Sequence, residues 1–195
     1  MHSTGRAAKN VILYSLATMA QKAISFVSFW VVSSHLSPHA LGTYFWVLSV
    51  MSLFAIGTDL GLTPLLTREA AQHPERRNES FVTVVWIKIF FACITAAIFW
   101  FLGTRDVLFG TNPLAIQLMI GATIILLCDA FLAACFALLR SAQLVNIESR
   151  SILVFQLVVF VGSVGGILFF PDPRTVMAAL ALGSVVNLCF TAWQT

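Results

Sequence analysis

The chain has 195 residues, of which 59% are hydrophobic and only 10% are charged, and its mean hydropathy is +0.92. A soluble domain carries about 25% charged residues, so this composition excludes a soluble globular protein and indicates a membrane protein. The net charge of +3 is small and reflects how the chain is oriented in a membrane, so we expect no nucleic-acid partner.

Six apolar segments approach or exceed the roughly 17–25 residues that a helix needs to cross the hydrocarbon core. They are residues 11–34, 41–62, 81–102, 114–139, 151–170 and 176–193. We therefore predict an all-α, polytopic membrane protein in which residues 1–195 form one six-helix domain. The first segment is too long for a signal-peptide core and no small-residue cleavage site follows it, so we expect it to be retained.

The first predicted helix has Gln21 and Lys22 in its middle, about twelve residues or roughly 18 Å from its start. A lysine near the bilayer centre costs about 2.5–3.5 kcal/mol, so it normally faces protein or a watery cavity. Ser15, Thr18 and Ser25 fall on the same helix face as Lys22. Two interpretations are open: this face lines a polar transport cavity, or its hydroxyls bond to neighbouring helices in ordinary packing.

The second predicted helix is interrupted close to its end. The stretch from Gly57 to Pro64 holds two glycines and a proline, with Asp59 among them, and we expect helix to resume before Pro74. Broken helices at membrane depth often border substrate or ion sites, which makes Asp59 a candidate cavity residue. The alternative is that Asp59 lies near the interface and pairs with a nearby cation.

The third and fourth predicted helices each carry one charge inside the membrane. Lys88 lies about seven residues, or roughly 10 Å, from the end of its helix, and Asp129 about ten residues, or roughly 15 Å, from the end of its own. A pair between them would satisfy both charges, and we predict that pair. The alternative for Lys88 is that its stem lies along lipid and its ammonium reaches the headgroups.

The last two predicted helices carry small and polar residues. Gly162 and Gly166 have the spacing that permits close helix contact. Ser184, Asn187 and Thr191 form a polar stripe on one face of the final helix. The chain then stops without a basic flank; a natural end would look the same, but we expect a truncated larger transporter.

Lysines and arginines are unevenly divided between the two ends of the helices. One end holds Arg6, Lys9, Arg68, Arg76, Arg77, Arg140 and Arg150. The other end holds only Arg105 and Arg174. The positive-inside rule then places the N-terminus in the cytoplasm, and six crossings return the C-terminus there.

The sequence offers little to an enzyme. His35 and His39 are four residues apart, but Pro38 interrupts the helix between them and no third metal ligand is near. The four cysteines lie inside predicted helices without metal-ligand spacing, and no phosphate-binding glycine loop or nucleophile–base set is present. We therefore predict no catalytic residue, no metal and no cofactor.

Three short runs carry a family resemblance. They are Leu36–Tyr44 (Leu-Ser-Pro-His-Ala-Leu-Gly-Thr-Tyr), Phe54–Leu62 (Phe-Ala-Ile-Gly-Thr-Asp-Leu-Gly-Leu) and Leu66–Glu69 (Leu-Thr-Arg-Glu). They resemble the pattern L-G-P-x-x-F-G-x-Y, D-L-G-L and x-R-E in the N-terminal half of bacterial polysaccharide flippases, within the multidrug/oligosaccharidyl-lipid/polysaccharide exporter superfamily. Ser37 and Leu41 are mild departures. The resemblance covers about residues 9–150, and the rest by hydropathy only.

The resemblance implies one six-helix lobe of a two-lobe flippase in the cell inner membrane. Such proteins move polyprenyl-diphosphate-linked oligosaccharides, used for O-antigen, lipopolysaccharide or other polysaccharide biosynthesis, across the bilayer by alternating access between the two lobes. Lys22, Lys88 and Arg68 are then the candidates to contact the diphosphate. The alternatives are a drug or cation antiporter of the same superfamily, and a structural membrane subunit that transports nothing.

Overall fold

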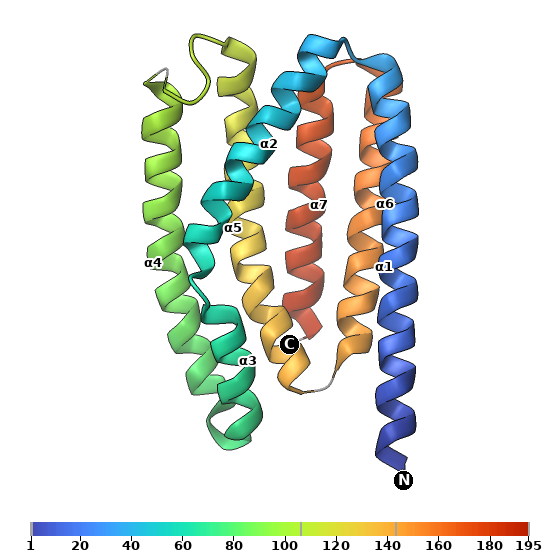
Figure 1. Ribbon diagram of the computed structural model, residues 1–195, viewed down its shortest axis with the longest axis vertical. Helices are drawn as coiled ribbons and strands as arrows, with labels where there is room; N and C mark the ends of the chain where they lie inside the picture. Colours follow the sequence, from blue (N-terminus) through green and yellow to red (C-terminus); the bar gives the residue numbers. More distant parts are fainter. Residues whose placement is uncertain (1, 106, 143, 195) are drawn as a thin grey trace.

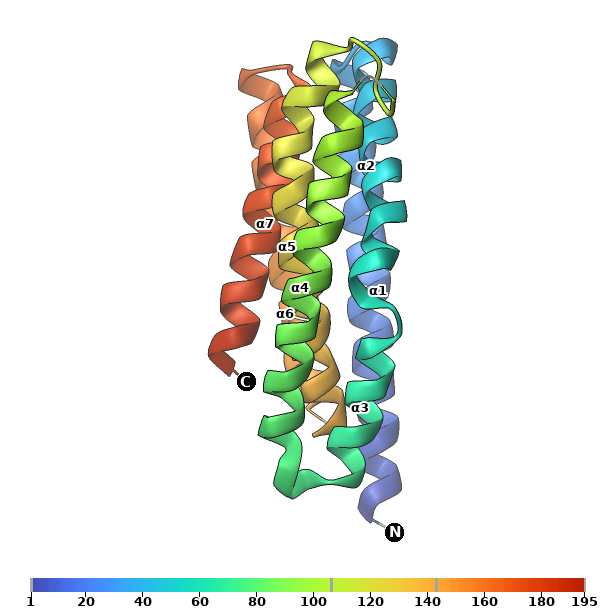
Figure 2. The ribbon, with the colours of Figure 1, turned by 90° about the vertical axis from the view of Figure 1, so that its left-hand side faces the viewer.

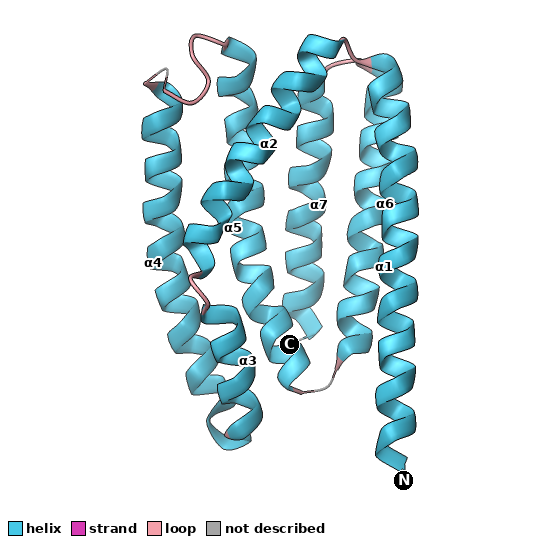
Figure 3. Cartoon of the chain, viewed as in Figure 1, coloured by secondary structure: helices cyan, strands magenta, loops and turns pink. Residues whose placement is uncertain are grey.

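The computed structural model describes residues 2–105, 107–142 and 144–194, with side chains from Tyr14 onward. The described part contains helices and no strand (Figure 3). The elements are α1 (His2–His35), α2 (Pro38–Asp59), α3 (Leu62–Gln72), the 3₁₀ turn η1 (Pro74–Arg76), α4 (Arg77–Thr104), α5 (Pro113–Ser141), α6 (Val145–Phe169) and α7 (Pro173–Gln194). The predicted all-α class is confirmed.

Six helical spans among the described residues are long and apolar enough to cross a membrane. They are Tyr14–His35, Pro38–Gln72, Pro74–Thr104, Pro113–Ser141, Val145–Phe169 and Pro173–Gln194. The helices begin earlier than the apolar segments, and α2 and α5 each begin at a polar side chain that caps the helix. The Ser37 hydroxyl accepts a hydrogen bond from the backbone N–H of Ala40 at 3.3 Å, and Pro38 occupies the first turn of α2.

The helices pack in the order α1, α6, α7, α5, α4, and the α2–α3 span lies across α5 and α4 (Figures 1 and 2). The α1–α2 turn lies at one end of the bundle, and α2 slants away from α1 toward α4 (Figure 1). Both termini lie at the opposite end, with the α3–α4 and α5–α6 connections (Figure 1). The excess of arginines predicted for one end of the helices lies in or next to these connections, at Arg68, Arg76, Arg77, Arg140 and Arg150. The side chains of Arg6 and Lys9 lie outside the described residues.

The predicted interruption of the second span is present between α2 and α3. Leu60 has a φ of 41° and Gly61 a φ of 83°, so two successive residues adopt the left-handed conformation. For Leu60 this conformation is strained, because its Cβ crowds the backbone. Helix resumes at Leu62 and continues to Gln72, as the sequence predicts.

Helices α6 and α7 approach closely where the predicted glycines lie. A Cβ atom added at Gly162 would meet the Ala179 Cβ at 2.9 Å, which is too close for any residue larger than glycine. The polar stripe of α7 also faces α6. The hydroxyl of Ser151 on α6 hydrogen bonds to the Asn187 side chain and lies 2.7 Å from the Thr191 hydroxyl. The stripe therefore stabilises packing inside the bundle.

We expect single cysteines at Arg76 and Arg105 to react with a membrane-impermeant maleimide from opposite sides of the membrane, because α4 separates the two positions. Arg76 should react from the cytoplasmic side. The measurement is labelling in intact cells and in inverted vesicles, in a variant without the four native cysteines. Reaction of both positions from one side would contradict the arrangement of the spans.

Candidate functional site

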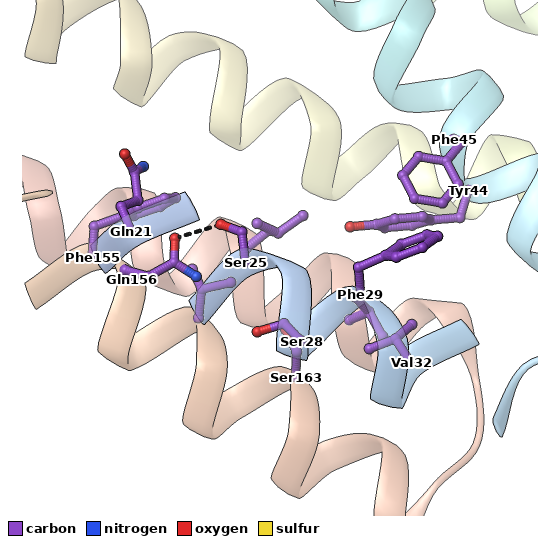
Figure 4. A pocket seen from close by; sticks show the side chains of 13 residues that line it. Gln21, Ser25, Ser28, Phe29, Val32, Tyr44, Phe45, Phe155, Gln156 and Ser163 are labelled. Atoms are coloured by element: carbon purple, nitrogen blue, oxygen red, sulfur yellow. Dashed lines mark hydrogen bonds between the residues drawn. The ribbon is translucent and has the colours of Figure 1, made fainter. Parts of the chain in front are cut away.

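A cavity of about 250 Å³ lies among α1, α2, α6 and α7 (Figure 4). Its lining comprises Gln21, Ser25, Ser28, Phe29, Val32, Tyr44, Phe45, Phe155, Gln156, Val159, Ser163, Val176 and Leu180. Ser25, Phe29 and Val32 reach it from α1 because their spacing places them on one helix face. The cavity therefore combines amide and hydroxyl groups with aromatic walls, and none of its lining residues carries a formal charge at neutral pH.

The hydrogen bonds of these polar groups are incomplete. The Ser25 hydroxyl donates to Oε1 of Gln156 at 3.0 Å (Figure 4), and the Ser28 hydroxyl donates to the Ile24 carbonyl at 3.0 Å. The Ser163 hydroxyl is buried, with a residue exposure of 2%, and it has no partner among the described residues. A buried hydroxyl without a partner costs about 1–3 kcal/mol, so it indicates that water or a ligand completes the site.

Lys22 lies beside this cavity on α1. It is exposed, and none of the described residues forms an ion pair or hydrogen bond with its ammonium group. Ser25 and Phe29, which line the cavity, follow Lys22 by three and seven residues and so share its helix face. Lys22 lies eight residues into the span that begins at Tyr14, or about 12 Å along the helix.

A second polar group lies at the break between α2 and α3. The Asp59 carboxylate accepts hydrogen bonds from the Lys88 ammonium, the Thr63 hydroxyl and, at 3.3 Å, the Thr63 backbone N–H. Lys88 is fully buried, and its ammonium also lies 3.1 Å from the Thr63 hydroxyl. Asp59 therefore caps the first turn of α3 and neutralises a buried cation at the same time.

The predicted pair between Lys88 and Asp129 is wrong. Lys88 pairs with Asp59 because α2 crosses α4 at the helix break, whereas Asp129 lies on α5 with its carboxyl within hydrogen-bonding reach of Ser184 on α7. The contact between Asp59 and Lys88 agrees with the alternative interpretation of Asp59, in which it pairs with a nearby cation. Arg68 is exposed on α3, and neither Arg68 nor Asp129 lines the cavity beside Lys22.

Three residues that line the cavity were not among the predicted site residues: Gln156, Tyr44 and Ser163. Gln156 is an amide in the middle of the apolar segment 151–170, so it carried the same signal as Lys22 and could have been found. Tyr44 and Ser163 carried no such signal, since both residue types are common in packed membrane helices. Among the described residues, no group of three or more His, Cys, Asp or Glu side chains gathers in a way that could hold a metal ion.

The fold and the cavity define a multi-pass membrane protein with a polar site enclosed by its spans. The family model of polysaccharide biosynthesis proteins matches residues 7–193, which is nearly the whole chain, and the chain belongs to that family. Together these findings support a polysaccharide-related membrane transporter. Comparison with curated proteins and with solved structures finds no match.

Replacement of Asp59 by Ala is expected to lower the free energy of unfolding by about 3–5 kcal/mol, because it leaves the buried Lys88 ammonium without its counter-charge. Membrane abundance and the melting temperature in detergent measure this loss. The second substitution Lys88→Met should restore part of it. Asp129→Ala is the matched control and should change both quantities little. Equal losses for the two aspartates, or no rescue by Lys88→Met, would contradict the pair.

Proposed function

We propose that this protein translocates a lipid-linked oligosaccharide across the inner membrane for polysaccharide biosynthesis, and that it catalyses no covalent reaction. The family match to polysaccharide biosynthesis proteins and the six apolar spans support this proposal. The lipid carrier is a polyprenyl diphosphate, whose two phosphates need a cationic contact while they cross the hydrocarbon core. Both termini lie in the cytoplasm in this proposal, as the distribution of arginine and lysine favours.

The observation that carries the proposal is the free charge of Lys22. A cation inside a span costs several kcal/mol unless it faces protein or water, and Lys22 is exposed without a partner among the described residues. Lys88, by contrast, is already neutralised by Asp59. Lys22 is therefore an intramembrane cation that is available to a diphosphate.

A second six-helix lobe supplies the other wall of the translocation path in this proposal. The exposed face of α1 around Lys22 then lies against an aqueous cleft between the two lobes. Alternate opening of this cleft to the two sides of the membrane moves the headgroup across. The cavity lined by Gln21 and Gln156 contains no acidic residue. This lining favours an anionic or neutral substrate over the cation of a drug or cation antiporter.

Replacement of Lys22 by Ala is expected to reduce polysaccharide export at least tenfold, because the diphosphate loses a charge-assisted contact of about 1.5–3 kcal/mol. Membrane abundance should stay unchanged, since Lys22 is exposed and has no hydrogen bond or ion pair with the described residues. Lys22→Arg should retain export, because it keeps the charge. Arg174→Ala, which removes an exposed cation at the other end of the bundle, is the control. Normal export by Lys22→Ala would refute this role of Lys22.

The requirement for a second lobe has its own test. The 195-residue chain, expressed alone, is expected to insert into the membrane but not to restore export in a strain that lacks its flippase. Co-expression with a second six-helix lobe should restore it. The measurements are membrane fractionation and surface polysaccharide. Restoration of export by the 195-residue chain alone would contradict the two-lobe arrangement.

A further inference from the structure

We propose that the cavity among α1, α2, α6 and α7 binds one uncharged sugar ring, and that the phosphate attached directly to this ring contacts Lys22. The inference rests on the proposed function and adds to it a specificity site: the cavity selects the sugar that adjoins the diphosphate. Four observations carry it, namely an unpartnered buried hydroxyl, a lining without charge that includes hydroxyl and amide groups, the aromatic walls, and the spacing between the cavity and Lys22.

The cavity has hydrogen-bonding groups that its own residues do not use. The buried Ser163 hydroxyl has no partner among the described residues, and Ser163 lines the cavity. The Tyr44 hydroxyl points into the cavity and makes no hydrogen bond to another described residue (Figure 4). The Gln156 side chain uses its oxygen to accept from Ser25, which leaves its amide N–H groups to donate to a ligand.

The chemistry of the lining fits a sugar better than a charged headgroup. Hydroxyl and amide groups can each donate or accept, which matches the hydroxyls of a sugar, and the rings of Phe29, Phe45 and Phe155 offer apolar faces to its C–H bonds. A carboxylate or phosphate inside this cavity would lose its hydration without meeting a counter-charge, which is costly. The volume of about 250 Å³ lies at the lower end of ligand pockets, so it holds one ring and not several.

The position of Lys22 favours the sugar that adjoins the phosphate. Lys22 precedes Ser25 by three residues, so their backbones differ by about 4.5 Å along α1. A glycosyl phosphate, in which the ring and the phosphate are joined directly, can therefore place its ring against Ser25 and its phosphate against Lys22.

Saturation-transfer NMR on the purified protein in lipid nanodiscs tests this site. The probes are glucose 1-phosphate, glucose, glucuronic acid and inorganic phosphate. The ring protons of glucose and of glucose 1-phosphate should receive saturation, with glucose 1-phosphate binding at least tenfold more tightly because of its phosphate. Glucuronic acid should bind more weakly than glucose to Lys22→Ala, where its carboxylate meets no cation. Inorganic phosphate should displace glucose 1-phosphate but leave glucose bound.

Three substitutions assign the contacts. Ser163→Ala should weaken glucose binding about fivefold without lowering the melting temperature, because the hydroxyl has no partner in the ligand-free protein. Lys22→Ala should abolish the advantage of glucose 1-phosphate over glucose. Ser149→Ala is the matched control: Ser149 is a buried serine on the same helix, bonded to the Val145 carbonyl and outside the cavity, and its loss should not change binding.

Absence of saturation on every ring, or equal binding of glucose and glucuronic acid to Lys22→Ala, would overturn the sugar site. So would equal effects of Ser163→Ala and Ser149→Ala, or a lower melting temperature for Ser163→Ala, since either result indicates a structural role. These outcomes are separate from failure of the proposed function. Normal export by Lys22→Ala would refute the role of Lys22 in export, whatever the binding measurements give.

Discussion

Hydrocarbon offers no hydrogen bond, so each polar side chain within these spans must be satisfied inside the protein or by water. The bundle meets this constraint in two ways. Lys88 with Asp59, and Ser151 with Asn187, satisfy one another within the helix packing. Lys22 and, in the cavity among α1, α2, α6 and α7, the Ser163 hydroxyl have no partner among the described residues. The second set is where the protein can bind something else.

The two sets occupy different parts of the bundle. The pair of Asp59 and Lys88 lies at the break between α2 and α3, where it neutralises a buried charge and caps a helix. The cavity lies instead beside the part of α1 from which α2 slants away (Figure 1). Because α2 leaves α1 to cross α5 and α4, it both reaches Lys88 and leaves the face around Lys22 uncovered. One tilt of one helix thus accounts for both sites.

Hydrophobic length was sufficient to predict the six spans, and Gly57, Gly61 and Pro64 were sufficient to predict the break in the second. The partner of Lys88 could not be predicted in this way. Depth along a helix can be counted from a sequence, and by depth alone Asp129 matched Lys88. Which helix faces Lys88 depends on the tilt of α2, which is set by packing throughout the bundle. Gln156 is a different case, because a single amide within an apolar run is a signal that the sequence does contain.

The contact between Asp59 and Lys88 also bears on how the protein is made. Asp59 precedes Lys88 by 29 residues, so the second span emerges from the ribosome with an acidic group whose counter-charge has not yet been synthesised. Thr63, only four residues later, is the one partner available at that stage. The second span therefore cannot settle into lipid with its charge neutralised until α4 has followed it. We therefore expect the second and third spans to insert as a unit, and a stalled chain that ends before α4 to be a substrate for membrane quality control.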